Sequence, residues 1–289
     1  FFAILTAGLS SCSNEFTTRP SEDSITADSY YKTNEQVASC TDALYNRTWF
    51  QFHNKFFFAI SEVGSGNMYT NSSDVNAMRN FSINGSDPEL NNGWQSLWAN
   101  VAQANYLINN LKIRVAPAVS QEVVNNALGE AYFMRATAYF YLVRLWGPVP
   151  IIENNLDHVS SPQLNTNRVE DVYELIRRDY VKASELLYSK TRGSAYASNV
   201  KVSKGSAKAM LAKVYLYMKD YQKAYDTSNQ VIALGYSLDP DFNHLFRPAG
   251  EFGTESVFEV NCNCSAEFGG SQYAEVQGVR NQFGWGFFV

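Results

Sequence analysis

The stretch Gly129–Pro150, GEAYFMRATAYFYLVRLWGPVP, decides the fold of this chain. Its apolar positions recur at helical spacing and include the stem of Arg135, so the segment predicts one long amphipathic helix. Gly147, Pro148 and Pro150 then end that helix, because proline cannot donate to the helical ladder and restricts the residue before it. The aromatic residues crowded into the helix are expected to lie in a core.

Helical spacing continues on both sides of this segment. We expect further helices over about 34–50, 93–112 and 169–188, and a helix pair over 205–233. The spacing places Tyr221, Tyr225 and Ile232 on the buried face of the second helix of that pair. Asn167 and Glu170 are spaced to cap the helix that starts near residue 169.

The helix pair over 205–233 turns at Lys219-Asp220, ends at Gly235 and resembles a tetratricopeptide repeat. The segments 122–146 and 169–188 form a second, more diverged pair. Such units bury their faces only by stacking on one another, so the chain predicts a mainly α fold with several helix pairs.

Two segments interrupt the helical pattern. Residues 64–93 are rich in Gly, Asn, Ser and Asp and predict a long irregular loop, which is uncommon in a compact domain without a functional reason. Residues 255–261 alternate apolar and polar side chains and predict a half-buried strand.

Composition excludes several classes of protein. The chain has 289 residues, 45% hydrophobic and 15% aromatic, which is enough to form a sizeable core. Its net charge of -5 gives no basic surface, which argues against a nucleic-acid partner. No stretch reaches the roughly 18 apolar residues that a transmembrane helix needs.

The first residues, FFAILTAGL, read as the end of a signal peptide, and Leu9-Ser10-Ser11-Cys12 resembles a bacterial lipobox. We therefore expect residues 1–11 to be a signal-peptide remnant, 12–28 a lipidated Cys12 with its tether, and 29–289 the folded domain. The alternative is a chance cysteine after an ordinary signal sequence. Each buried methylene of an acyl chain would contribute about 0.8 kcal/mol to membrane anchoring.

The sequence marks out no catalytic constellation. Cys40, Cys262 and Cys264 do not form a paired framework and are expected to be free thiols. The histidines are isolated, so no metal site is predicted, and no glycine-rich phosphate loop follows a strand, so no cofactor is expected. A carboxylate pair of a glycosidase stays open as an alternative, although no pair stands out.

A set of motifs follows in a fixed order along the chain. They are Leu9–Cys12, Tyr30-Tyr31, the helix with Trp94 and Trp98, Gly129–Pro150, Val202–Gly205, Glu255–Glu259 and Phe283–Gly286. Their order resembles that of SusD/RagB-type lipoproteins, the surface nutrient-binding proteins of Bacteroidetes. Two features depart from the family pattern: Ile60–Val63 lacks an acidic pair, and family members continue for about as long again, so we expect a missing C-terminal part.

The resemblance implies a site for glycans in and after the irregular segment. The matching residues are Asp74, Arg79, Asn80, Asn91 and Trp94. Aromatic rings pack on the apolar faces of sugars, and Asp, Asn and Arg bond their hydroxyls. Alternatively, Asp74 and Asn91 stabilise turns, Arg79 is a surface charge, and Trp94 belongs to the core.

The implied function is that of an outer-membrane lipoprotein, held by its lipid and exposed at the surface. It would bind oligosaccharides and deliver them to a SusC-like TonB-dependent transporter without catalysis. A tetratricopeptide-type scaffold that binds protein or peptide at the cell envelope is the alternative.

Overall fold

The computed structural model describes residues 30–46, 48, 52–53, 55–70, 72–160, 163–189, 200–260 and 287–288. Within these residues helices predominate, and two short strands pair with each other. The elements are α2 (Asn34–Ser39), α3 (Asp42–Tyr45), α4 (Phe56–Phe58), η2 (Ala59–Val63), β1 (Tyr69–Thr70), η3 (Ser73–Val75), α5 (Asn76–Arg79), α6 (Pro88–Arg114), α7 (Gln121–Trp146), η4 (Asn155–His158), α8 (Val169–Leu186), α9 (Lys204–Tyr217), α10 (Tyr221–Ile232), η6 (Phe242–Phe246), η7 (Pro248–Gly250) and β2 (Phe287–Phe288).

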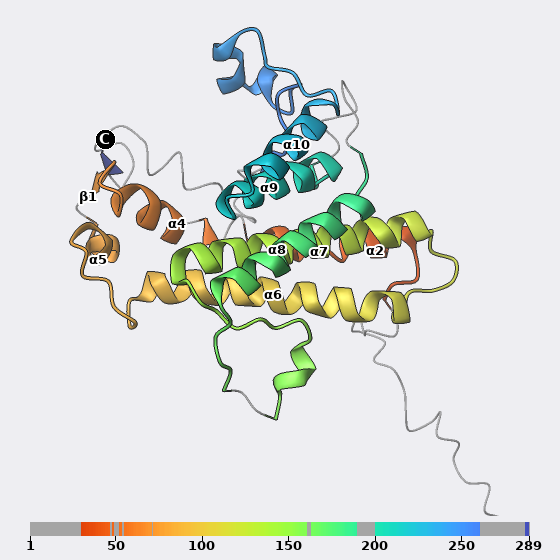
Figure 1. Cartoon of the computed structure of the whole chain (residues 1–289), viewed down its shortest axis with the longest axis horizontal. Coiled ribbons are helices and arrows are strands. Elements are labelled where there is room, and N and C mark those ends of the chain that lie inside the picture. Colours follow the sequence, from red (N-terminus) through yellow and green to blue (C-terminus); the bar gives the residue numbers. More distant parts are fainter. Residues whose placement is uncertain are drawn as a thin grey trace, which may run out of the picture.

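The long helices pack in chain order, each against the next. α7 lies between α6 and α8, α8 packs on α9, and α9 pairs with α10 (Figure 1). This stacking of consecutive helices confirms the predicted mainly α architecture with tetratricopeptide-like pairs, irregular connections and a few short strands.

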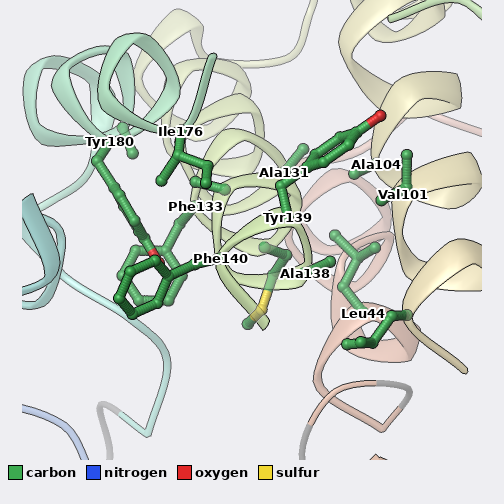
Figure 2. Close-up of a cluster of buried hydrophobic side chains, with 14 of the residues drawn as sticks. Leu44, Val101, Ala104, Ala131, Phe133, Ala138, Tyr139, Phe140, Ile176 and Tyr180 are labelled. Atoms are coloured by element: carbon green, nitrogen blue, oxygen red, sulfur yellow. The ribbon is translucent and has the colours of Figure 1, made fainter. Parts of the chain in front are cut away.

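α7 is the centre of the core and contains the signature stretch. Ser120 caps its first turn, and Gly147 ends it at φ 72, a left-handed backbone that glycine adopts without strain. Phe133 and Phe140 lie toward Ile176 and Tyr180 of α8 (Figure 2). Ala131, Ala138 and Tyr139 of α7 lie on another side of the helix, so α7 is covered on more than one side. Figure 2 shows them near Leu44 of α3 and Val101 and Ala104 of α6.

α6 begins earlier than the sequence indicated. Asp87 accepts a hydrogen bond from the amide of Leu90 at 2.9 Å, and Pro88 occupies the first helical position, where no N–H is needed. At Gly93 any Cβ would overlap the ring of Phe56, so glycine is required for α4 to approach α6. The predicted irregular loop is therefore shorter, and it contains β1, η3 and α5.

Two predictions about helix ends were wrong. The expected helix over 34–50 is interrupted between α2 and α3, at Cys40 and Thr41, where the hydroxyl of Thr41 donates to the carboxylate of Glu130 at 2.6 Å. The Asn167 side chain does not cap α8. It accepts from the amide of Ile151 at 2.8 Å, and α8 starts after Arg168 with no side-chain cap.

The outer face of α10 is exposed, which corrects a further expectation. Tyr221, Tyr225 and Ile232 point away from α9, which covers only the side of α10 that carries Ala224 and Thr227. The spacing identified an apolar stripe correctly, but among the described residues no further helix lies on it.

The described part of the predicted strand, residues 255–260, is not a strand. Glu255 accepts from the amide of Asp239 at 2.9 Å, and Glu259 accepts from the amide of Phe252 at 3.0 Å. Both glutamates of the Glu255–Glu259 motif therefore accept hydrogen bonds from backbone amides of a loop. Cys262, Cys264 and Gly284–Gly286 lie outside the described residues, as do Cys12 and the expected tether.

His53 is held among aromatic rings on the outside of α7. It stacks on Phe57 at 4.3 Å between ring centroids, and its Nε2 lies 3.0 Å from the Tyr141 hydroxyl. Phe52 lies against the same tyrosine, with 4.6 Å between ring centroids. Burial lowers the pKa of His53 to about 4, because the charged imidazolium would lose water.

The stability of the fold is expected to fall as the pH drops from 7 to 5. The pKa of His53 is depressed in the folded state, so its contribution is present above its unfolded pKa of about 6.5 and is lost toward its folded pKa of about 4. The loss between pH 7 and 5 is roughly 2 kcal/mol. Urea unfolding of wild type and His53→Phe at both pH values measures it. An equal fall in both proteins would contradict this assignment.

Candidate functional site

The sequence-predicted ligand residues lie on two neighbouring parts of the fold. Asp74 is in η3, and Arg79 and Asn80 lie at the end of α5. Asn91 and Trp94 are in the first turns of α6. Figure 1 shows α4, β1 and α5 gathered at the end of the bundle where α6 begins.

Lys55 connects the two parts. Its Nζ lies 2.5 Å from Oδ2 of Asp74 and 3.6 Å from Oε1 of Glu89 in the first turn of α6. The hydrogen bond and charge of Lys55 lower the pKa of Asp74. Asp74 is therefore a charged, partly exposed acceptor whose position is fixed, and sequence reasoning missed the lysine that fixes it.

Arg79 is fastened to protein acceptors. Its Nη1 donates to the carbonyl of Thr70 at 2.9 Å and to the hydroxyl of Tyr69 at 3.3 Å. Its Nη2 donates to Oδ1 of Asn76 at 2.5 Å, and its Nε donates to Oδ1 of Asn80 at 3.3 Å. The guanidinium lies over the ring of Tyr69, with 5.3 Å to the ring centroid. Arg79 is therefore held in place by these protein acceptors, unlike the unpaired surface charge that was the alternative interpretation.

The two asparagines are exposed. Asn80 donates to Oδ1 of Asn76 at 3.1 Å, and Asn91 donates to the carbonyl of Gly85 at 3.5 Å, near the limit for a hydrogen bond. The side-chain oxygen of Asn91 and the remaining hydrogen-bonding capacity of Asn80 face solvent.

Trp94 belongs to a row of aromatic rings. Its ring lies 5.5 Å from that of Trp98 and 5.2 Å from that of Trp146, which stacks in turn on Phe56 at 5.8 Å. Trp94 and Trp98 are both half-buried against the core. Trp94 offers part of its ring to solvent and uses the rest for packing.

Two exposed aromatic side chains near these residues were missed. Tyr69 is 52% exposed and Phe81 is 78% exposed. Phe81 also has a positive φ of 54, which is uncommon for a residue with a Cβ and strained for an aromatic one. The available signal was that Tyr69 and Phe81 are the two aromatic residues in residues 64–93, a stretch rich in Gly, Asn, Ser and Asp.

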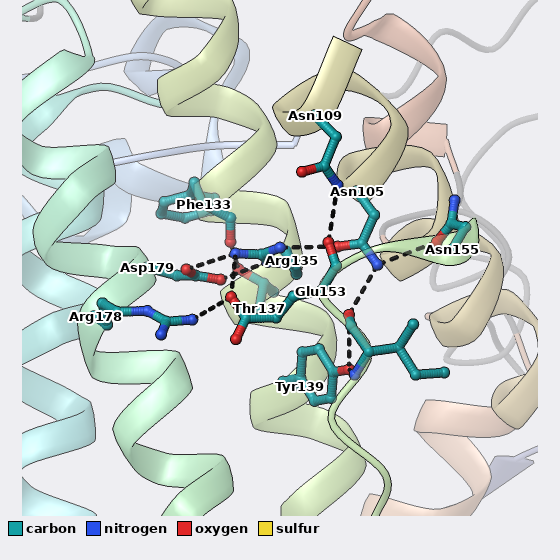
Figure 3. Close-up of polar contacts among 11 residues, drawn as sticks. Asn105, Asn109, Phe133, Arg135, Thr137, Tyr139, Glu153, Asn155, Arg178 and Asp179 are labelled. Carbon is teal, nitrogen blue, oxygen red and sulfur yellow. Dashed lines mark hydrogen bonds and ion pairs between the residues drawn. The ribbon is translucent and has the colours of Figure 1, made fainter. Parts of the chain in front are cut away.

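Farther along α6 and α7, a buried polar network fixes the chain that follows α7 (Figure 3). Arg135 donates to both carboxylate oxygens of Asp179, at 2.7 and 2.9 Å, and to Oδ1 of Asn105 at 2.8 Å. Asn105 in turn donates to the carbonyl of Ile152 at 2.8 Å, and the amide of Ile152 donates to the hydroxyl of Tyr139. The network joins α6, α7 and α8 to the segment after Pro150.

A second buried network surrounds Glu130 of the signature helix. Its carboxylate accepts from the hydroxyls of Thr41 and Tyr45, at 2.6 and 3.0 Å, and from the amide of Asn126 at 2.8 Å. Nζ of Lys201 lies 3.4 Å away. Burial raises the pKa of Glu130. This network joins the first helices to α7 and to the segment before α9.

The described residues contain no group of three or more His, Cys, Asp or Glu side chains that could hold a metal ion. None of the described helices combines the length and apolar character that a membrane crossing requires.

Comparison with known proteins adds an independent finding. Residues 18–216 match a family model, SusD-like_3, described as starch-binding and associating with the outer membrane. A SusD-like protein of Bacteroides ovatus is 33% identical over 207 residues, which is 71% of this chain and 36% of the relative. SusD-like protein P2 of Formosa agariphila is 30% identical over 225 residues, covering 73% of this chain and 43% of the relative.

Solved structures share the fold. One crystallised with a xylogluco-oligosaccharide superposes with a TM-score of 0.68 at 27% identity, over 83% of this chain and 50% of that one. A laminarin-binding SusD-like protein gives a TM-score of 0.70 at 24% identity, over 81% and 52%. The chain spans less than half the length of these two curated relatives, 36% and 43%.

Proposed function

The chain belongs to the SusD-like family, described as starch-binding and associating with the outer membrane, and from this we propose that it binds an oligosaccharide for uptake. The glycan is bound without chemical change and is passed to a SusC-like TonB-dependent transporter. The relative crystallised with a xylogluco-oligosaccharide supports a glycan as the ligand class.

The observation that carries the proposal is the polar and aromatic surface at the start of α6. Asp74 offers a fixed carboxylate, and Asn80 and Asn91 offer exposed amides. Trp94 adds part of an aromatic ring. Hydroxyl-rich, flat-faced ligands are recognised by this combination of hydrogen-bonding groups and rings.

The lipid anchor at Cys12 and the tether that follows it are part of the same proposal. An acyl-modified Cys12 would hold the protein at the outer membrane, exposed at the surface, while the tether lets the helical domain stand above it. Labelling with a fatty-acid analogue in the native host tests this, because Cys12→Ala would then lose the label.

Saccharide binding is the decisive measurement. Calorimetry with maltoheptaose, a xyloglucan heptasaccharide and laminarihexaose should show binding of at least one, with the sugar recovered intact. Replacing Asn80 and Asn91 together by alanine should weaken that binding about tenfold, at roughly 0.5–1.5 kcal/mol for each hydrogen bond. Asn229→Ala, an exposed amide on α10, is the matched control and should bind like wild type.

A separate observation supports a second candidate function, the binding of protein or peptide. The exposed stripe of Tyr221, Tyr225 and Ile232 on α10 is the kind of surface that protein partners cover. Tight binding of a peptide library together with no affinity for any of the three saccharides would favour a peptide-binding scaffold over the proposed glycan binding.

A further inference from the structure

We propose that Tyr69 supplies the ring on which a sugar of the bound glycan stacks, and that Arg79 is a positioning residue that holds this ring. The inference rests on the proposed glycan binding and names the side chain that makes its main apolar contact. It also names the class of glycan that fits: an uncharged one.

The backbone forces the Tyr69 side chain outward. Tyr69 and its neighbour Thr70 form β1, which pairs with β2, and successive side chains of a strand point to opposite faces. Thr70 is fully buried, so Tyr69 must point to solvent, where it is 52% exposed. An exposed ring on a paired strand has little freedom to turn into the core.

Arg79 then fixes the orientation of that ring. Its guanidinium lies over the ring, and its Nη1 binds both the Tyr69 hydroxyl and the Thr70 carbonyl, on the two residues of the same strand. A side chain that is ordered before the ligand arrives loses less entropy on binding. Because the nitrogens of Arg79 already donate to protein oxygens, its effect on the ligand passes through Tyr69.

Trp94 and Phe81, the other aromatic candidates, are less suited to stack on a sugar. Trp94 is half-buried between two tryptophans, so its ring is largely used for packing. Phe81 is more exposed than Tyr69, but no described side chain braces it. We therefore expect Phe81→Ala to weaken binding less than Tyr69→Ala.

This surface carries no excess of positive charge. Lys55 and Arg79 are opposed by Asp74 and Glu89, and Lys55 lies between the two carboxylates. Glu62, which accepts hydrogen bonds from Asn67 and Met68 just before the ring, adds a third carboxylate, so there is no net positive field to concentrate an anionic sugar. A neutral glycan, whose apolar sugar faces can stack on a ring, fits this surface.

The first test uses the 289-residue chain and measures affinity for the xyloglucan heptasaccharide and laminarihexaose. Tyr69→Ala should weaken binding about tenfold, in line with the energies of ring contacts, whereas Tyr69→Phe keeps the ring and should lose less than about threefold. Tyr188→Ala, at a 44% exposed tyrosine that follows α8, should bind like wild type. Wild-type affinity in Tyr69→Ala would overturn the assignment of the ring.

The second test separates positioning from direct contact. Arg79→Met should weaken binding about fivefold in the presence of Tyr69 and cause no further loss in Tyr69→Ala, because its effect passes through the ring. An equal loss in both backgrounds would show that Arg79 touches the ligand itself. Thermal unfolding of each variant shows whether it retains the fold.

A third arm tests the ligand class, using tetragalacturonate as an anionic probe. It should bind more weakly than the neutral oligosaccharides, and a preference for it would overturn the inference about charge. If the wild-type chain binds neither neutral nor anionic saccharides, the proposed function fails before any variant is compared. If wild type binds but Tyr69→Ala binds equally well, only the inference about Tyr69 fails.

Discussion

Replacing Arg135 by methionine is expected to lower the free energy of unfolding by roughly 3–5 kcal/mol, the usual cost of removing one member of a buried ion pair. The side chains of Arg135 and Asp179 are only 2% and 1% exposed. Methionine fills most of the volume of arginine but leaves the Asp179 carboxylate without its two hydrogen bonds, and Asn105 loses the donor to its Oδ1. Urea unfolding followed by circular dichroism at neutral pH measures the change.

The matched control is Arg178→Met on the same helix as Asp179. Arg178 also contacts a carboxylate, that of Glu153, but the two side chains are 53% and 49% exposed, so the loss should stay below about 1 kcal/mol. The double variant Arg135→Met, Asp179→Leu should recover part of the stability, because no uncompensated charge is left inside. Equal losses for Arg135→Met and Arg178→Met would show that the buried network contributes no more than a surface pair.

This network also shows how far the sequence predicts the fold. The periodicity of Gly129–Pro150 predicted a helix, and Gly147 ends it, because helix formation and its termination depend on nearby residues. The same periodicity placed the stem of Arg135 on the apolar face. It could not show that the charge is buried as well, because Asp179 and Asn105 come from other helices.

A similar limit applies at the edges of the fold. Helical spacing identified Tyr221, Tyr225 and Ile232 as one apolar stripe of α10, but spacing does not say whether another element covers that stripe. Asn167 had the right spacing for a helix cap, yet its side chain bonds Ile151 in a neighbouring loop. Local signals predict local structure, and tertiary contacts decide among the possible partners.

The candidate site follows the same rule. Motif order pointed to Asp74 and Arg79, and the structure places them on neighbouring elements. No sequence motif pointed to Lys55, which joins η3 to α6, or to the strand that turns Tyr69 outward, because both depend on how separate segments meet. The predicted residues lie on one part of the surface and stay a prediction, and the contacts of each could be described only from the structure.

The Glu130 network predicts a loss of stability that depends on pH when Lys201 is replaced. Lys201 is the cation beside the buried Glu130 carboxylate, and it also pairs with the exposed Asp42 at 2.8 Å. Burial raises the pKa of Glu130, while Lys201 acts in the opposite direction. Removing Lys201 therefore raises the pKa of Glu130 further above its unfolded value of about 4.3.

Lys201→Met is therefore expected to cost about 3 kcal/mol at pH 7.5 and only about 1 kcal/mol at pH 4.5. A carboxyl group with a raised folded pKa contributes stability below its unfolded pKa and loses it as the pH rises through the folded pKa. The penalty must therefore grow with pH. Urea unfolding of wild type and variant at both pH values measures this penalty. Subtracting the free energy of unfolding of the variant from that of wild type at each pH cancels the titrations that both proteins share. Lys223→Met, which removes the exposed pair with Asp220, should leave the free energy of unfolding almost unchanged at either pH. A Lys201→Met penalty that is the same at both pH values would mean that Thr41, Tyr45 and Asn126 hold Glu130 without help from Lys201. Lys201 would then act through its other partners, which are Asp42, the carbonyl of Ala38 and the hydroxyl of Thr41.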